Sequence, residues 1–165
     1  MRSFALGLTA ALVTATAAAA GAPAPLPEKL FTSAADVQAL MAQAKAEHTN
    51  QANIGKNLIR LDPYTATLEN RFAVGPAAIH NTEAEVFYVV EGSGTLVTGG
   101  TLVNPTSPNP ENVTGTAIAG GQSRPVAKGD FYVIPQGVPH WYSQINGALI
   151  LMSLHVPRGA GAAKP

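Results

Sequence analysis

The stretch that decides the fold reads GDFYVIPQGVPH, from Gly129 to His140. Five residues separate Gly129 from Pro135, one separates Pro135 from Gly137, and two separate Gly137 from His140. Because glycine and proline mark turns, this spacing predicts a turn, a strand, a second turn and then a histidine at the start of the returning strand. The two turns would hold such a histidine rigidly, so that it can point into a barrel.

A second stretch reads EVFYVVEG, from Glu85 to Gly92, and His80 lies five residues before it. Together the two stretches resemble the signature motifs of the cupin superfamily, whose second motif ends in a metal-ligand histidine. The first family motif has another histidine two residues before the one that His80 matches, and this chain has Ala78 there. The family also has an asparagine four residues after the second-motif histidine, where this chain has Gln144.

The resemblance covers roughly residues 57–158 and implies an all-β cupin double-stranded β-helix (a jelly-roll barrel) with one N-terminal helix. It also implies a metal site on His80, Glu85 and His140. Two imidazoles and one carboxylate suit a divalent transition metal (Fe, Mn, Zn or Ni) and leave coordination positions open for substrate or oxygen. Glu83 is an alternative ligand if the turn before Glu85 folds differently. The alternative to a metal is an empty barrel, in which the two histidines hydrogen-bond to polar neighbours.

Strand alternation predicts three further side chains in the lumen, Phe87, Tyr142 and Gln144. They would line a pocket for a small, largely uncharged organic molecule, with a phenol and an amide as orienting groups. The candidates for catalytic proton transfer are Glu83 and Tyr142. His155 lies in the last expected strand, and the sequence assigns it no role.

From residue 53 onward, short apolar runs alternate with Gly, Pro and Asn, which is typical of an all-β barrel or sandwich. Residues 33–46 predict one helix, capped by Ser33 and followed by a solvated His48. We expect a turn at Glu91–Gly94, and a long surface loop that cannot pair regularly at Asn104–Asn112.

The N-terminus predicts export. Arg2 is followed by an uncharged and largely apolar run from Phe4 to Ala20, which ends in the small residues of a signal-peptidase site. We expect cleavage after Ala20 and a periplasmic or secreted protein; the alternative is an uncleaved membrane anchor. The predicted organisation is a signal peptide (1–20), a linker (21–32), a cupin domain (33–158) and a flexible tail (159–165).

Composition excludes several classes of function. Ten Lys and Arg balance ten Asp and Glu, and no basic stripe is present, so nucleic acid is not an expected partner. The chain has no cysteine, which excludes disulfides, thiolate metal sites and thiol catalysis. We expect no membrane partner after cleavage, and the family resemblance suggests a homodimer.

Two functions remain open from the sequence, which does not decide whether the protein is an enzyme. The first is a metal-dependent enzyme of dioxygenase, isomerase or lyase type that acts on a small organic molecule. The second is a non-catalytic module that binds a small ligand without a metal. Glu85 and His140 favour the first function, and Ala78 favours the second.

Overall fold

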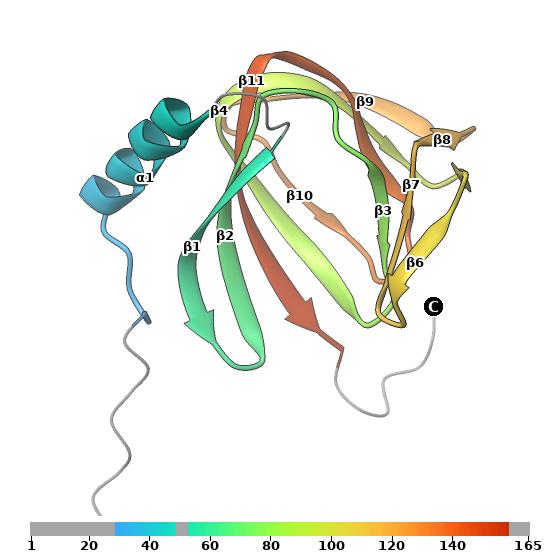
Figure 1. The fold of residues 1–165 in the computed structure, drawn as a ribbon, viewed down its shortest axis with the longest axis horizontal. Coiled ribbons are helices and arrows are strands. Elements are labelled where there is room, and N and C mark those ends of the chain that lie inside the picture. The colour runs from blue at the N-terminus through green and yellow to red at the C-terminus, as the bar shows by residue number, and fades with distance from the viewer. Residues whose placement is uncertain (1–28, 49–52, 159–165) are drawn as a thin grey trace, which may run out of the picture.

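The computed structural model describes residues 29–48 and 53–158, so the predicted signal peptide, the first part of the linker and the predicted tail lie outside the described residues. Helix α1 (Ala34–Glu47) is followed by strands β1 (Asn53–Leu61), β2 (Tyr64–Arg71), β3 (Ala77–His80), β4 (Glu83–Thr98), β5 (Thr101–Val103), β6 (Thr106–Asn109), β7 (Asn112–Gly115), β8 (Ala117–Ala119), β9 (Gln122–Ala127), β10 (Phe131–Ile134) and β11 (His140–Pro157). The strands curve around a common interior, and α1 lies outside them beside β1 and β2 (Figure 1). The predicted all-β fold with one helix is confirmed.

The two longest strands, β4 and β11, form the frame of the barrel. They pair antiparallel along nearly their whole lengths, and the second half of β11 also pairs with β2. Strands β9 and β10 pair with β4, while β3, β7 and β6 continue the sheet from the start of β11. Strands β5 and β8 form a separate two-stranded sheet.

The turn expected at Glu91–Gly94 is wrong, because β4 runs through this segment without ending. Gly92 has a φ of 85°, and a Cβ at this position would lie 1.9 Å from the carbonyl oxygen of Ala148 in β11. Glycine therefore allows the two strands to approach while β4 bends.

The expectation that residues 104–112 do not pair regularly is confirmed, because a register shift interrupts the pairing between Thr106 and Asn109, but these residues are not only a loop. They contain β6, which pairs antiparallel with β7 despite Pro108. Strand β6 lies at the end of the sheet, where a proline without an N–H group is tolerated.

The predicted helix is confirmed. The hydroxyl of Ser33 accepts a hydrogen bond from the backbone N–H of Asp36, and the Asp36 carboxylate accepts one from the backbone N–H of Ser33. The buried face of α1 packs on the outer face of the sheet, in a cluster of Val37, Met41, Leu58, Leu68 and Ile150. The prediction of a solvated His48 is wrong, because its ring stacks on Phe72 with the centroids 4.0 Å apart. Within the described residues, no helix has the length and hydropathy needed to cross a membrane.

A second apolar cluster fills the barrel interior. Its buried members are Phe87, Val89, Leu96, Val126, Ile134, Tyr142, Leu149 and Leu151. Successive residues of a strand point to opposite faces, so β4 and β11 contribute to this interior cluster with one face and to the α1 cluster with the other. The lumen residues described below share the interior face.

Candidate metal centre

Three strands bring the predicted ligands together. His80 ends β3, Glu85 lies near the start of β4, and His140 begins β11. Oε2 of Glu85 lies 3.2 Å from Nε2 of His80 and 3.1 Å from Nε2 of His140. The donor atoms of all three residues lie within 4.8 Å of one another.

Each imidazole has a second partner that fixes its orientation. Nδ1 of His80 lies 2.6 Å from Oδ1 of Asn112, whose amide nitrogen donates to the side chain of Asn109. Nδ1 of His140 lies 3.2 Å from the carbonyl oxygen of Val138. Because these oxygens only accept, Nδ1 carries the proton in each neutral imidazole. Such outer partners are typical of histidines that bind metals.

The two Nε2 atoms therefore present lone pairs toward Glu85. The oxygen that they face, Oε2 of Glu85, is itself an acceptor when the carboxyl group is ionised. Three lone pairs that converge in a buried place require a cation between them, which is either a metal ion or a proton on an imidazole.

Electrostatics keep Glu85 ionised. Burial alone would raise the pKa of this carboxyl group, but its contacts with His140, His155 and His80 outweigh burial and hold the pKa well below its usual range. Burial likewise would lower the pKa of His80, and its hydrogen bond with Glu85 raises it. The site is thus a buried anion surrounded by imidazoles.

His155 is the site residue that the sequence analysis missed. Its Nε2 lies 2.9 Å from Oε1 of Glu85, and its Nδ1 lies 2.6 Å from Oε1 of Glu83. Both partners accept, so both ring nitrogens donate and the ring is an imidazolium. Burial opposes this charge, but Glu85 and Glu83 raise the pKa of His155 to about 9. A protonated ring has no lone pair for a metal, so His155 holds the second oxygen of Glu85.

Glu83 lies outside the converging set. Its Oε1 is bound to His155 and lies 3.8 Å from Nδ1 of His80, on the side of that ring turned away from Glu85. Glu83 therefore positions His155 in this arrangement.

The predicted pocket residues divide into two groups. Phe87 and Tyr142 are buried in the interior cluster, and their rings meet edge to face. The hydroxyl oxygen of Tyr142 lies 2.6 Å from that of Tyr132, and burial raises the pKa of both phenols, that of Tyr132 to about 12. Gln144 is instead exposed and donates to Asn146, because a register shift after Tyr142 interrupts the alternation.

The residues present fit a divalent metal. Two ligands that each lie about 2.0–2.2 Å from a tetrahedral zinc ion are about 3.4 Å apart, and the separations of Oε2 of Glu85 from the two Nε2 atoms, 3.2 and 3.1 Å, are close to this value. Ala78, which stands where the family has another histidine, is the Cα partner of His140. Its methyl group offers no ligand, so the chain supplies three.

A curved, antiparallel β-barrel with two histidines and one carboxylate at its interior is a barrel of the jelly-roll class with a candidate metal site. The family model described as "Cupin" matches residues 42–158, and the chain belongs to this family.

Several solved structures are similar to this chain at low sequence identity. The protein TT1209 of Thermus thermophilus is 14% identical with a TM-score of 0.50, and the match covers 72% of this chain and 95% of that one. KdgF from Halomonas sp. is 17% identical with a TM-score of 0.47, and the match covers 68% and 87%. A cupin superfamily protein from Desulfitobacterium hafniense DCB-2 is 11% identical with a TM-score of 0.47, and the match covers 67% and 82%. No curated protein sequence matches this chain.

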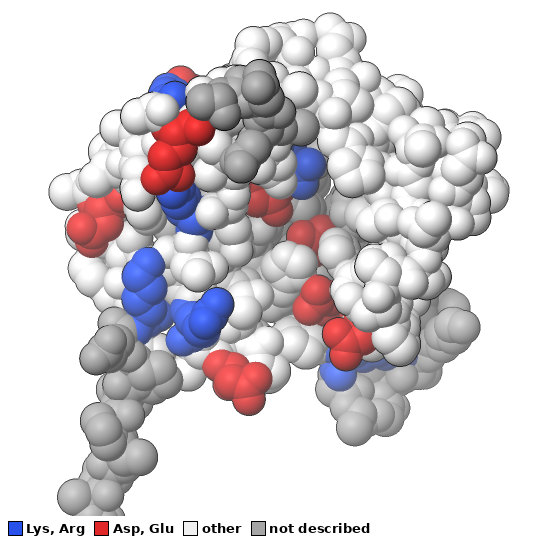
Figure 2. Space-filling view, viewed as in Figure 1, with Lys and Arg blue, Asp and Glu red and all other residues white. Residues whose placement is uncertain are grey.

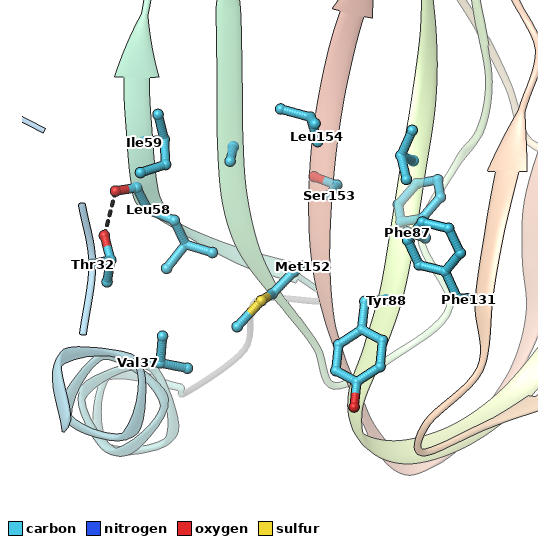
Figure 3. A pocket seen from close by; sticks show the side chains of 12 residues that line it. Thr32, Val37, Leu58, Ile59, Phe87, Tyr88, Phe131, Met152, Ser153 and Leu154 are labelled. Carbon is cyan, nitrogen blue, oxygen red and sulfur yellow. Dashed lines mark hydrogen bonds between the residues drawn. The ribbon is translucent and has the colours of Figure 1, made fainter. Parts of the chain in front are cut away.

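An apolar surface lies on the outside of the barrel, away from the metal centre. Tyr88 of β4 is the Cα partner of Phe131 in β10 and of Met152 in β11, and the exposed fractions of Phe131 and Val133 are 71% and 55%. Between this surface and α1 runs a groove of about 470 Å³, with Val37 and Leu58 on its far wall (Figure 3). An exposed apolar surface of this kind is typical of a contact with another molecule.

Proposed function

We propose that this protein binds a divalent transition metal in its barrel and acts on a small organic molecule there. The observation that carries the proposal is the convergence of two Nε2 lone pairs on Oε2 of Glu85. His80, Glu85 and His140 would hold the ion. When bound, such an ion polarises a substrate oxygen or activates oxygen or water, as dioxygenase, isomerase or lyase chemistry requires.

The chain's own groups have separate tasks in this proposal. Asn112 and the carbonyl of Val138 hold the two imidazoles with Nε2 toward the centre. His155 holds the other oxygen of Glu85, which favours binding of the ion through one oxygen only. The raised pKa of Tyr142 keeps its hydroxyl protonated at neutral pH, so this residue can donate a hydrogen bond to a substrate but is a poor base. Glu83 stays a candidate for proton transfer.

Metal analysis tests the proposal. Protein purified from its native compartment without chelators should contain one ion per chain, and His80→Ala and His140→Ala should abolish it. Glu85→Gln should weaken binding, because it removes the ligand charge and keeps the shape. His48→Gln is the control, since that ring stacks on Phe72 away from the site. Occupancy should fall as the pH is lowered, because protons compete with the metal for the imidazoles, and the raised pKa of His80 places the start of this fall above about pH 6.5, the ordinary imidazole value.

The second candidate is a metal-free module that binds a small ligand. The observation that favours it is that imidazoles already provide hydrogen bonds to both oxygens of Glu85. If the purified protein holds no metal and titration with Zn²⁺, Mn²⁺ and Fe²⁺ gives no binding, this candidate replaces the first. If the protein does bind a metal, oxygen uptake by the loaded protein separates an oxygenase from the other reaction types.

We also propose that the protein is exported and cleaved after Ala20. The charged start, the uncharged run and the small residues before the cut support this. N-terminal sequencing of protein recovered outside the cytoplasm should begin at Gly21. A sequence that begins at Met1 would refute cleavage.

A homodimer through the outer apolar surface is our proposal for the assembly. Among the described residues β10 pairs only with β4, so the other edge of β10 is free. The apolar surface that contains Tyr88 and Phe131 extends to this edge. A second copy, related by a two-fold axis, could extend the sheet there and cover this surface. Light scattering should give twice the chain mass at micromolar concentration, and Phe131→Asp should halve it. Val74→Asp, which alters an exposed apolar residue after β2, should not. A monomeric wild type would refute this assembly.

A further inference from the structure

An ion pair lies in the barrel lumen beside the metal centre. Glu69 and Arg71 stand at the end of β2, and their Cα partners in β11 are Leu151 and Leu149, two fully buried members of the interior cluster. Paired residues of neighbouring strands share a face, so both charged side chains face the lumen. Their exposed fractions are 10% for Glu69 and 17% for Arg71.

One edge of the Arg71 guanidinium is free. Nε and Nη2 both donate to the same oxygen, Oε2 of Glu69, at 2.9 and 2.5 Å. Nη1 makes no hydrogen bond within residues 29–48 and 53–158. The guanidinium lies over the ring of Tyr142, 4.7 Å from its centroid. The free edge presents N–H groups of Nη1 and Nη2 side by side, which is the geometry that binds a carboxylate through two parallel hydrogen bonds.

Tyr142 connects Arg71 to the candidate metal centre. Tyr142, under the guanidinium, follows His140 by two residues on the same strand, and two residues advance about 6.6 Å. Burial would lower the pKa of the Arg71 guanidinium, but the carboxylates of Glu69 and Glu85 outweigh burial and raise it, so the charge of Glu85 acts at Arg71. Figure 2 shows a hollow in this face of the molecule, between β1–β2 and the β3–β7–β6 side, with acidic and basic atoms inside it.

A contribution to the stability of the fold is not a sufficient reason for an ion pair at this place. Charges placed among residues such as Phe87 and Leu149 lose hydration, and apolar side chains of similar volume are often as stabilising. A second polar group in the lumen also lacks a partner: Oγ of Ser153, in the row of Phe87, is buried and makes no hydrogen bond among the described residues.

We propose that Arg71 binds the carboxylate of a small organic monoanion whose other end reaches His80, Glu85 and His140. The second half of this statement rests on the proposed function. The Glu69–Arg71 and Glu83–His155 pairs are each neutral, so a divalent ion beside Glu85 leaves one net positive charge, which a monoanion neutralises. A dianion such as phosphate would meet the repulsion of Glu69 and Glu85. The sequence predicts a largely uncharged ligand. The charged side chains in the lumen favour a short-chain carboxylate instead.

The test compares two probes of equal length, 4-hydroxybutyrate and its neutral amide, by calorimetry on the zinc-loaded full chain. The wild type should bind the acid at least tenfold more tightly than the amide. Arg71→Gln should bind both equally, and Arg71→Lys should keep only part of the preference, because lysine lacks the planar pair of donors. Arg124→Gln, which removes an exposed arginine of β9, should leave the preference unchanged. Zinc content should be the same in all variants.

Two results would overturn the inference: an acid preference that survives Arg71→Gln, or a wild type that shows no preference for the acid. The comparison of acid and amide on the wild type needs no variant, so it decides even if Arg71→Gln does not fold. If the chain binds no zinc, the proposed function fails separately. The same two probes on the metal-free protein, followed by NMR, then still decide whether Arg71 binds a carboxylate.

Discussion

The imidazolium of His155 makes the stability of the metal-free protein depend on pH in a defined window. The pKa of His155 is raised from 6.5 to about 9 in the folded state by Glu85 and Glu83, against the effect of burial. The folded protein therefore holds this proton more tightly than the unfolded chain. The stabilisation is fully present below about pH 6.5, decreases between 6.5 and 9, and is lost above 9. At 1.36 kcal/mol for each pKa unit, it amounts to about 3 kcal/mol.

Urea denaturation with a chelator present, at pH 6, 7.5 and 9, measures this contribution. The wild type should lose about 3 kcal/mol of unfolding free energy between pH 6 and 9 beyond any loss in His155→Gln, whose amide does not titrate. His48→Gln should follow the wild type over the same range. If His155→Gln loses as much stability as the wild type between these pH values, the imidazolium bridge between the two carboxylates does not exist.

Three other perturbations follow from single contacts. Asn112→Ala removes the acceptor that orients His80 and should weaken metal binding about 10- to 100-fold, measured by competition with a chromophoric chelator; an unchanged affinity would contradict the assigned orientation of the ring. Gly92→Ala places a Cβ against the carbonyl of Ala148 at a positive φ, and should cost at least about 2 kcal/mol in urea denaturation; a cost near zero would mean that β4 and β11 separate easily there. Ser33→Ala removes the helix cap and should cost about 1 kcal/mol, and a variant as stable as the wild type would show that α1 does not need it.

The parts of the fold that depend on local spacing could be predicted from the sequence. The turns around Pro135 and Gly137 fix where β11 begins, so His140 could be placed at the start of a strand from its neighbours alone. Helix α1 follows in the same way from the cap at Ser33. The family resemblance added the partners of His140 in the site.

The parts that depend on strand register could not be predicted. His155 contacts Glu85 because the two are Cα partners, 70 residues apart in the chain, and no local pattern states that register. The sequence around Glu69 and Arg71 predicts only charged residues near the end of a strand. Their position in the lumen follows from their partners in β11. Gln144 is exposed because a register shift interrupts the alternation, which periodicity alone does not anticipate.

One carboxylate holds both ends of the last strand. Strand β11 begins at His140 and ends just after His155, and these two rings bind opposite oxygens of Glu85. The strand therefore curves around the barrel, and its second end returns to Glu85, the residue that its first end contacts. Fraying at the C-terminal end of β11 removes His155 from Glu85, and the loss of this partner also weakens the contact of Glu85 with His140 at the N-terminal end. We expect β11 to open as one cooperative unit, with the amide hydrogens near both ends exchanging at similar rates, and a bound ion to slow the exchange at the two ends together.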